Sequence, residues 1–370
     1  MADIVSARTV TLAEAENRIV RAFRNKLPVF LWGPPGVGKS ELMAGIANKG
    51  ILGNATLVDI RVALMEPTDL RGMPFLSKKQ DNMLWAPPVD LPSEEMAAEY
   101  DTVILFLDEM NAAAPAVQAA AYQLILNRRI GTYKLPENVV IVAAGNRESD
   151  KGVTYRMPTP LANRFVHLEV RADYESWLNW AVNNQISEDV VGYISFAKQD
   201  LMDFDPRASG RSFATPRSWT YVSRFLEDDT ISDSELTDLV SGCVGEGVAI
   251  KFMAHRKVAK DMPHPKDILA GKVKELKIKE ISAQYALTIG MCYELKNAYD
   301  DFGKKDSKRW HEMADNFFRF MMDFFPTEMT VMGARTAITN YGLPFQPDKL
   351  SNFKEFFDRF GKYVVKAMEN

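Results

Sequence analysis

The stretch VFLWGPPGVGKSEL, residues 29–42, joins a short apolar run to a glycine-rich turn and the start of a helical segment. The turn satisfies the pattern G-x-x-x-x-G-K-S through Gly33, Gly38, Lys39 and Ser40. Glycines let consecutive backbone N–H groups turn toward phosphates, and the N-terminus of the following helix adds positive potential. A turn that merely joins strand to helix is the alternative, but the flanking pattern favours phosphate binding. The stretch therefore predicts a nucleotide site.

The residue types in this turn predict the cofactors. Lys39 is expected to reach the β- and γ-phosphates of ATP, and the Ser40 hydroxyl is expected to ligate Mg²⁺. The predicted nucleotide-binding residues are Gly33, Pro34, Pro35, Gly36, Val37, Gly38, Lys39, Ser40 and Glu41.

A second motif, TVILFLDEM at residues 102–110, places Asp108 and Glu109 at the end of an apolar strand. In an open α/β sheet, ligand chemistry gathers at the carboxyl ends of the strands. Adjacent acids there are often only a solvated strand end, but the phosphate-binding turn upstream favours a functional pair. Asp108 is predicted to hold Mg²⁺, and Glu109 to orient or deprotonate the attacking water.

Three further polar residues follow in chain order. Asn146 ends the run AAGN, Arg164 precedes the strand FVHLEV, and Arg217 stands behind Pro216 at a helix start. Asn146 is predicted to position the water. Arg164 is predicted to act as an arginine finger, in its own subunit or a neighbour's, and Arg217 to reach the γ-phosphate from a lid.

Continuous apolar runs alternate with helical stretches through the first half of the chain. Such runs are expected of strands covered on both faces, so the fold class predicted is α/β with a parallel sheet. The predicted strands are residues 27–32, 55–62, 102–108, 138–145 and 165–170. Residues 11–26 predict an amphipathic helix with a capping box formed by Thr11 and Glu14.

The strand pattern fades after about residue 172, and the remainder predicts helices. We expect an α/β nucleotide-binding core at residues 1–172, a helical lid at 173–255 and a helical C-terminal region of unknown role at 256–370. The aromatic and methionine-rich residues 310–325 are typical of a core or of a face against another subunit.

The composition of the chain argues against several classes of protein. The chain has 370 residues, of which 46% are hydrophobic, and a net charge of −4 makes it a poor overall match for nucleic acid. We expect no membrane span and no secretory signal. Two cysteines without paired spacing and scattered histidines predict neither disulfides nor a metal site besides Mg²⁺, which fits a reducing cytoplasm.

The ordered series GPPGVGKS, LFLDEM, AAGN, NRF and TPRSW resembles the AAA+ ATPases. Residues 108–146 and the segment EPTDLRGMP look like the MoxR-like branch, and the resemblance covers about residues 10–230. It implies a core with an all-helical lid, a ring of six subunits with nucleotide sites at subunit boundaries, and these residue roles. Gly33 to Ser40 would be Walker A, Asp108 and Glu109 Walker B, Asn146 sensor 1, Arg164 the finger and Arg217 sensor 2.

The chain departs from that branch at Ala112, where an arginine is usual. Other arginines therefore stay open as the finger; they are Arg128, Arg129, Arg147 and Arg156. Residues 73–88 and 127–138 each predict a β-hairpin. The resemblance places such hairpins at the pore or top of the ring. From their position in the hairpins, Trp85 and Tyr133 are expected to be exposed aromatic residues. The alternative is two surface hairpins without a function.

The function predicted is a ring-forming ATPase that remodels or matures a protein partner or complex. The resemblance implies an adaptor that carries a von Willebrand factor A domain. The alternative is a nucleic-acid-directed motor of a DNA-handling or restriction assembly, which basic residues of the hairpins keep open (Lys78, Lys79, Arg128, Arg129 and Lys134). A nucleotide-dependent scaffold is a third reading, although a scaffold has no need of Glu109.

Overall fold

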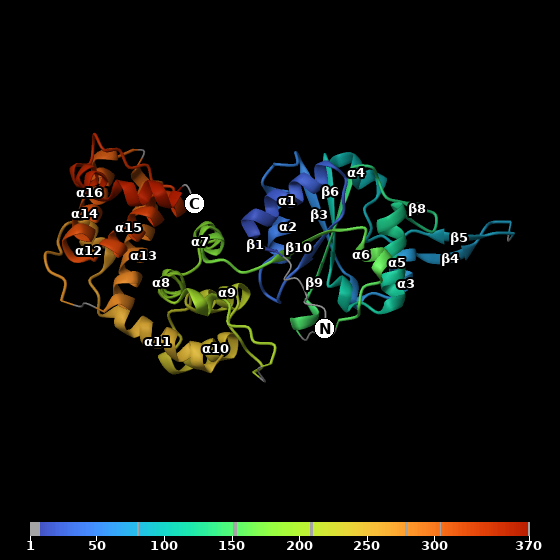
Figure 1. Ribbon diagram of the computed structural model, residues 1–370, viewed down its shortest axis with the longest axis horizontal. Helices are drawn as coiled ribbons and strands as arrows, with labels where there is room; N and C mark the ends of the chain where they lie inside the picture. The colour runs from blue at the N-terminus through green and yellow to red at the C-terminus, as the bar shows by residue number, and fades with distance from the viewer. Residues whose placement is uncertain are drawn as a thin grey trace. The chain divides into compact units, whose positions relative to one another are not determined.

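The structure is a computed structural model that describes residues 8–79, 81–150, 154–207, 210–277, 280–303 and 305–368. The chain divides into two compact units (Figure 1). Unit 1 comprises Met1–Asp173 with Phe204–Ala208, and unit 2 comprises Tyr174–Asp203 with Ser209–Asn370.

Unit 1 is built on a six-stranded sheet in the order β1-β10-β2-β9-β6-β3, in which every neighbouring pair is parallel. The strands are β1 (Thr9–Val10), β2 (Val29–Trp32), β3 (Ala55–Arg61), β6 (Thr102–Asp108), β9 (Val139–Gly145) and β10 (Val166–Val170). The parallel α/β prediction is confirmed, and each predicted strand lies within two residues of the observed bounds. The short β1 was not predicted.

Both faces of the sheet are covered, which explains why the strands are apolar throughout. Along β6, Ile104 and Phe106 join one apolar core, while Val103, Leu105 and Leu107 join the other. The longer helices that contribute to the cores are α1 (Leu12–Arg24), α2 (Lys39–Asn48) and α5 (Pro115–Asn127). Side chains alternate between faces with a period of two, so consecutive buried residues must serve both cores.

The first helix forms as its sequence predicts. The Thr11 hydroxyl accepts a hydrogen bond from the Glu14 N–H, and the Glu14 carboxylate accepts one from the Thr11 N–H. Ala15, Ile19 and Phe23 are buried on one face of α1.

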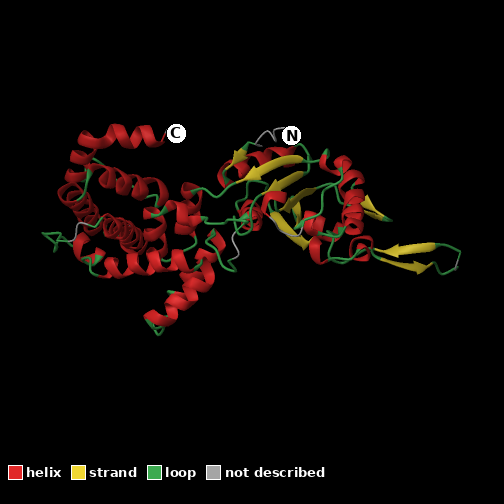
Figure 2. Ribbon diagram, turned by 60° about the horizontal axis from the view of Figure 1, so that its bottom comes forward, coloured by secondary structure: helices red, strands yellow, loops and turns green. Residues whose placement is uncertain are grey.

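Short elements complete unit 1. They are η1 (Val62–Leu64), α3 (Pro67–Arg71), α4 (Glu94–Glu99), η2 (Met110–Ala112), η3 (Glu148–Asp150) and α6 (Thr159–Ala162). Two antiparallel pairs stand apart from the main sheet, β4 (Met73–Leu76) with β5 (Met83–Ala86) and β7 (Arg129–Ile130) with β8 (Tyr133–Lys134). Both predicted hairpins are therefore present, and Figure 2 shows the β4–β5 hairpin extending away from the sheet.

The described part of unit 2 is helical (Figure 2). Its elements are α7 (Tyr174–Asn183), α8 (Glu188–Phe196), η4 (Lys198–Leu201), α9 (Pro216–Phe225), α10 (Asp233–Val244), α11 (Glu246–Lys260), α12 (Pro265–Leu269), α13 (Ile281–Ala298), η5 (Tyr299–Gly303), α14 (Ser307–Phe324), α15 (Thr327–Arg335), η6 (Thr336–Asn340) and α16 (Ser351–Met368).

Two apolar cores organise unit 2. One joins α7–α11 around Trp219 and Phe252, and the other joins α12–α16 around Trp310 and Phe318. The aromatic residues of α14 are buried in the second core, so the prediction of a core at residues 310–325 is confirmed. Helix α11 runs without a break through residues 255 and 256, and a division of the helical part at that point stays a prediction.

Candidate nucleotide site

The glycine-rich turn connects β2 to α2 in the middle of the sheet. Gly36 and Gly38 have φ angles of +73° and +106°, in the left-handed region that favours glycine. Gly38 is also the N-cap residue of α2, and no side chain caps that end. Backbone N–H groups at an uncapped helix start are donors for an anion, and the helix dipole favours negative charge there.

Lys39, the first residue of α2, is buried with 9% of its surface exposed. Its ammonium donates hydrogen bonds to the carbonyl oxygens of Gly33 (2.8 Å) and Pro34 (3.2 Å) and to Oδ1 of Asn146 (3.3 Å). The turn after β2 and the end of β9 are therefore joined at this lysine. This arrangement places a cation where the turn would receive phosphate groups.

Ser40 and the acidic strand end meet beside that lysine. The Ser40 hydroxyl donates to Oδ2 of Asp108 at 3.1 Å, and Oδ1 of Asp108 accepts the Glu109 N–H at 2.8 Å. Glu109 has a φ angle of +54°, a left-handed conformation that turns the chain sharply away from β6.

The Ser40–Asp108 pair suits Mg²⁺. Octahedral coordination at 2.0–2.1 Å separates adjacent ligand oxygens by about 2.9 Å. The observed separation of 3.1 Å between the two side-chain oxygens is close to that value. A hydroxyl and a carboxylate oxygen are also the hard ligands that this ion prefers.

Two residues near the site were not singled out by sequence reasoning. Asn111, in η2, is 2% exposed and donates from Nδ2 to the backbone oxygen of Asn146 at 2.7 Å. Asp59 lies on β3, which pairs with β6, and burial together with the Asp108 charge raises the pKa of the Asp59 carboxyl. An acid within the predicted strand ATLVDIRV was the available signal for Asp59.

The arginines that could act as the arginine finger differ in their side-chain contacts. Arg164 is exposed, and its side chain makes no hydrogen bond or ion pair with any residue that the structure describes. Arg147 is paired with Asp150 at 2.9 Å and with Glu169 at 3.0 Å. Arg128 donates to the carbonyl oxygens of Pro136 and Val139, so its guanidinium is engaged within the loop around β7 and β8.

Arg217 lies at the start of α9 in unit 2, and its side chain is exposed. Thr215 caps this helix in a capping box with Ser218, and the Trp219 indole donates to the Asp200 carbonyl at 2.8 Å. The helix start that carries Arg217 is therefore well anchored within unit 2.

The two hairpins correct part of the sequence interpretation. Tyr133 is half-buried, its hydroxyl donates to the Pro92 carbonyl at 2.7 Å, and its ring packs against a sheet core, so the prediction of an exposed aromatic residue was wrong. Trp85 is also half-buried, and the Arg71 guanidinium lies 5.5 Å from its ring. Both aromatic residues therefore contact other residues of unit 1.

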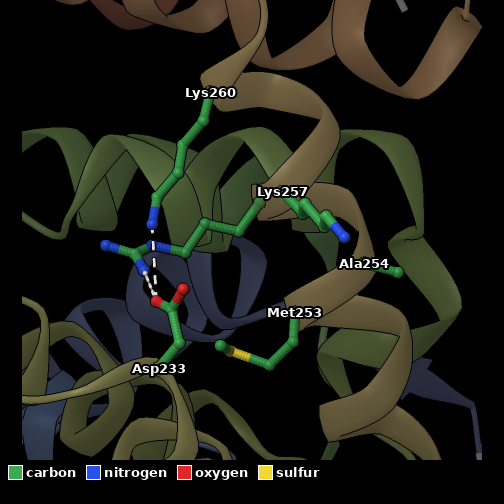
Figure 3. Close-up of a pocket in the computed structure, with 6 residues that line it drawn as sticks. Asp233, Met253, Ala254, Lys257 and Lys260 are labelled. Carbon is green, nitrogen blue, oxygen red and sulfur yellow. Dashed lines mark hydrogen bonds and ion pairs between the residues drawn. The ribbon is translucent and has the colours of Figure 1, made fainter.

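A separate pocket of about 350 Å³ lies on α10 and α11 of unit 2 (Figure 3). Arg256 and Lys260 are paired there with Oδ1 of Asp233, at 3.5 Å and 3.4 Å. The pocket contains none of the predicted nucleotide-binding residues.

Comparisons with known proteins agree with this geometry. Residues 29–170 match the model of the ATPase family associated with various cellular activities (AAA). Midasin from Giardia intestinalis is 28% identical over 185 residues, which are 48% of this chain and 4% of that protein. This chain thus corresponds to only a small part of that relative.

The chain is also similar to solved structures. RuvB from Thermotoga maritima is 17% identical, with 68% of this chain and 79% of that one covered and a TM-score of 0.36. NtrX from Brucella abortus in complex with ATP is 14% identical, with 91% and 69% covered and a TM-score of 0.36. Both TM-scores are below 0.5, whereas the family match over residues 29–170 identifies an AAA ATPase domain.

Proposed function

We propose that this chain is a Mg²⁺-dependent AAA+ ATPase of the MoxR-like branch. It forms a ring with copies of itself, a hexamer, and couples ATP binding and hydrolysis to the remodelling or maturation of a protein partner or complex. A cytoplasmic location fits the free thiols of Cys243 and Cys292. Residues 173–255 would serve as the lid, and residues 256–370 are available for a partner.

The roles proposed for the site residues follow from their positions. The backbone of residues 33–40 and the Lys39 ammonium would hold the phosphates, and Ser40 and Asp108 would hold the ion. Mg²⁺, when bound, neutralises charge that develops on the phosphate oxygens. Glu109 would orient the attacking water and take its proton, and Asn146 would hold that water in line.

The two arginines would act on developing negative charge. Arg164 would reach the nucleotide of a neighbouring subunit. Its guanidinium is exposed and has no partner in the described part of the chain, which supports that role over the ion-paired Arg147. Arg217 would reach the γ-phosphate from the lid. A nucleotide that touches both parts can then bias their arrangement when the γ-phosphate leaves.

The observation that carries the remodelling proposal is the apolar character of the β4–β5 hairpin. Its exposed side chains include Met73 (68%), Leu76 (61%) and Met83 (63%). Directly opposed residues share a face of a hairpin, so the pairs Phe75–Leu84 and Leu76–Met83 make opposite faces apolar. An exposed apolar surface of this kind suits a protein partner, to which an adaptor with a von Willebrand factor A domain could direct the ring.

The nucleic-acid motor remains a second candidate because Lys78 and Lys79 are exposed between β4 and β5, and Lys134 is exposed on β8. Arg128 no longer supports it, since backbone carbonyls occupy its guanidinium. Binding through these lysines would fall steeply with salt as counterions are released.

The test uses Glu109→Gln, which should bind ATP but hydrolyse it slowly, as bait in native lysate. Captures with ATP and with ADP are compared, each with and without nuclease. Lys39→Ala, which should not bind nucleotide, serves as the matched control. Protein partners that are retained only with ATP and are indifferent to nuclease support remodelling.

Recovery of nucleic acid, or loss of all partners after nuclease treatment, would favour the motor instead. Equal capture by Glu109→Gln and Lys39→Ala would contradict a nucleotide-dependent function of either kind.

A further inference from the structure

Asn111 connects the η2 turn to two later segments of unit 1. Its Nδ2 donates to the backbone oxygen of Asn146 at 2.7 Å, and its own backbone oxygen accepts the Tyr155 N–H at 2.7 Å. It lies in η2, two residues after Glu109, whose left-handed φ of +54° starts the same turn. The turn that carries Glu109 is thus tied to the strand end that carries Asn146.

The orientation of the Asn111 amide is determined by its surroundings. Turning the amide over would place its oxygen against the Asn146 carbonyl oxygen, where two acceptors would repel. The Asn111 Oδ1 atom packs against Gly145, because a Cβ added at position 145 would lie only 2.1 Å from that oxygen. Glycine at position 145 is therefore what allows the Asn111 side chain to lie against the end of β9.

This arrangement leaves one polar atom unsatisfied. Asn111 Oδ1 is buried and has no hydrogen-bond partner among the residues that the structure describes. A buried acceptor without a donor costs about 1–3 kcal/mol, which is as large as the gain from one ordinary hydrogen bond. Net stabilisation is therefore a poor reason for an asparagine at this position.

We infer that Asn111 is a positioning residue for ATP hydrolysis: it holds Asn146 at a set distance from Glu109, so that both side chains address one water molecule. The inference rests on the roles proposed above for Glu109 and Asn146. In this proposal Asn111 contacts neither the nucleotide nor the water. It acts through the Asn146 backbone, and a displacement of about 1 Å in such a constellation lowers turnover on the order of a hundredfold.

The chain offers a matched control in Gln118. This amide is also 2% exposed and also donates to a backbone oxygen, that of Ala113 at 3.0 Å. It lies on α5, and its acceptor Ala113 ends the η2 turn, so this bond ties the turn to α5 rather than to Asn146. Gln118→Leu removes a buried amide of the same kind without touching the proposed link.

The experiment compares wild type, Asn111→Leu and Gln118→Leu by kcat and KM for ATP, by the Kd of a fluorescent ADP analogue and by Tm. Asn111→Leu is expected to lower kcat by roughly ten- to a hundredfold, with the Kd within twofold of wild type. Its Tm should stay within a few degrees, because the lost hydrogen bond is offset by removal of the orphaned acceptor. Gln118→Leu should retain the wild-type kcat.

Asn111→Asp gives an independent readout through pH. An ionised carboxylate cannot donate to the Asn146 oxygen, whereas a protonated one can, and burial raises the pKa of such an introduced acid. Its kcat relative to wild type should therefore recover as the pH is lowered from 8.5 toward 6. A purely structural role would give no recovery beyond the change in the folded fraction, which is measured at each pH.

The inference is overturned if Asn111→Leu keeps its kcat within twofold, or if its kcat falls only in proportion to the folded fraction. A constant ratio of Asn111→Asp to wild type across the pH range overturns it as well. Absence of ATPase activity in the wild type would instead contradict the proposed function, so the two failures can be told apart.

Discussion

The Ser40 hydroxyl and Asp108 Oδ2, from residues 68 positions apart in the chain, lie 3.1 Å from each other. One oxygen belongs to the helix that follows β2 and the other to the end of β6. Between these strands runs β9, which ends beside Asn146. Three strand ends thereby bring the phosphate-binding turn, the acidic pair and the amide to one edge of the sheet.

The Ser40–Asp108 pair predicts the Mg²⁺ dependence of ATP hydrolysis. Because both oxygens are expected to surround one ion, Ser40→Ala and Asp108→Asn should each raise the Mg²⁺ concentration for half-maximal activity by about ten- to a hundredfold. The measurement is a Mg²⁺ titration of steady-state ATPase activity, and EDTA should abolish activity in every variant. ADP affinity measured without Mg²⁺ serves as the control and should change little. Titrations that superimpose on that of the wild type would exclude this pair as the ion site.

The exposure of Arg164 predicts that it acts on a neighbouring subunit. Arg164→Ala should lower kcat by about a thousandfold or more, as expected when a finger is removed. A mixture of Arg164→Ala with Lys39→Ala should recover part of the activity, because interfaces then form that combine an intact turn with an intact arginine. Arg156→Ala, another exposed arginine of unit 1, is the control and should behave as the wild type. Failure of the mixture to recover would place the arginine in its own subunit, and an active Arg164→Ala would assign the finger elsewhere.

Because His255 is buried, we expect the stability of unit 2 to decrease in acid. It is 5% exposed, neither ring nitrogen has a partner among the described residues, and burial lowers its pKa from 6.5 to about 4. Between these pH values the unfolded chain binds one more proton than the folded one. Stability therefore falls as the pH drops from 6.5 toward 4, by about 1.4 kcal/mol per pH unit and about 3 kcal/mol in total.

Urea unfolding of wild type and His255→Phe from pH 7.5 to 4.5 measures this contribution. Phenylalanine keeps an aromatic ring beside Phe196 and Tyr193 but cannot take up a proton. As the pH is lowered, the free energy of unfolding should decrease less in His255→Phe than in the wild type. Parallel curves for the two proteins would show that His255 does not cause the acid sensitivity.

The start of the β4–β5 hairpin predicts a strict requirement for glycine at position 72. Gly72 has φ +85° and ψ −174°, and an added Cβ would lie 1.8 Å from the Ala86 carbonyl oxygen. Gly72→Ala should therefore lower the free energy of unfolding by about 2–4 kcal/mol, or release the hairpin to proteolysis. Gly50→Ala is the control, since Gly50 also has a positive φ of +69° but nothing lies within 4 Å of its Cβ position. Equal Tm values and equal proteolysis of the two variants would contradict the steric argument.

Sequence reasoning reached the strands and the catalytic motifs because both depend on local patterns. Continuous apolar runs must be covered on two faces, and a glycine turn between strand and helix has few uses besides phosphate binding. The roles of Arg164 and Arg217 stay predictions, since they depend on where these exposed side chains reach.

Local patterns failed where a side chain is held by a distant backbone group. The sequence suggests an exposed aromatic residue at Tyr133, but its hydroxyl donates to the Pro92 carbonyl oxygen and its ring packs against a sheet core. The sequence suggests a basic loop residue at Arg128, but its guanidinium donates hydrogen bonds to the carbonyl oxygens of Pro136 and Val139. Nothing in the composition of either segment indicates these partners.

The amino-acid sequence by itself therefore determined the α/β class, the nucleotide-binding turn and the acidic pair, because propensity, periodicity and glycine conformation act over a few residues. Only the tertiary structure decided that Lys39 meets Asn146, that Ser40 meets Asp108, and that the buried amide of Asn111 joins the two sides. Those contacts depend on strand order and register, which arise from packing across the whole sheet and are not encoded in any one segment.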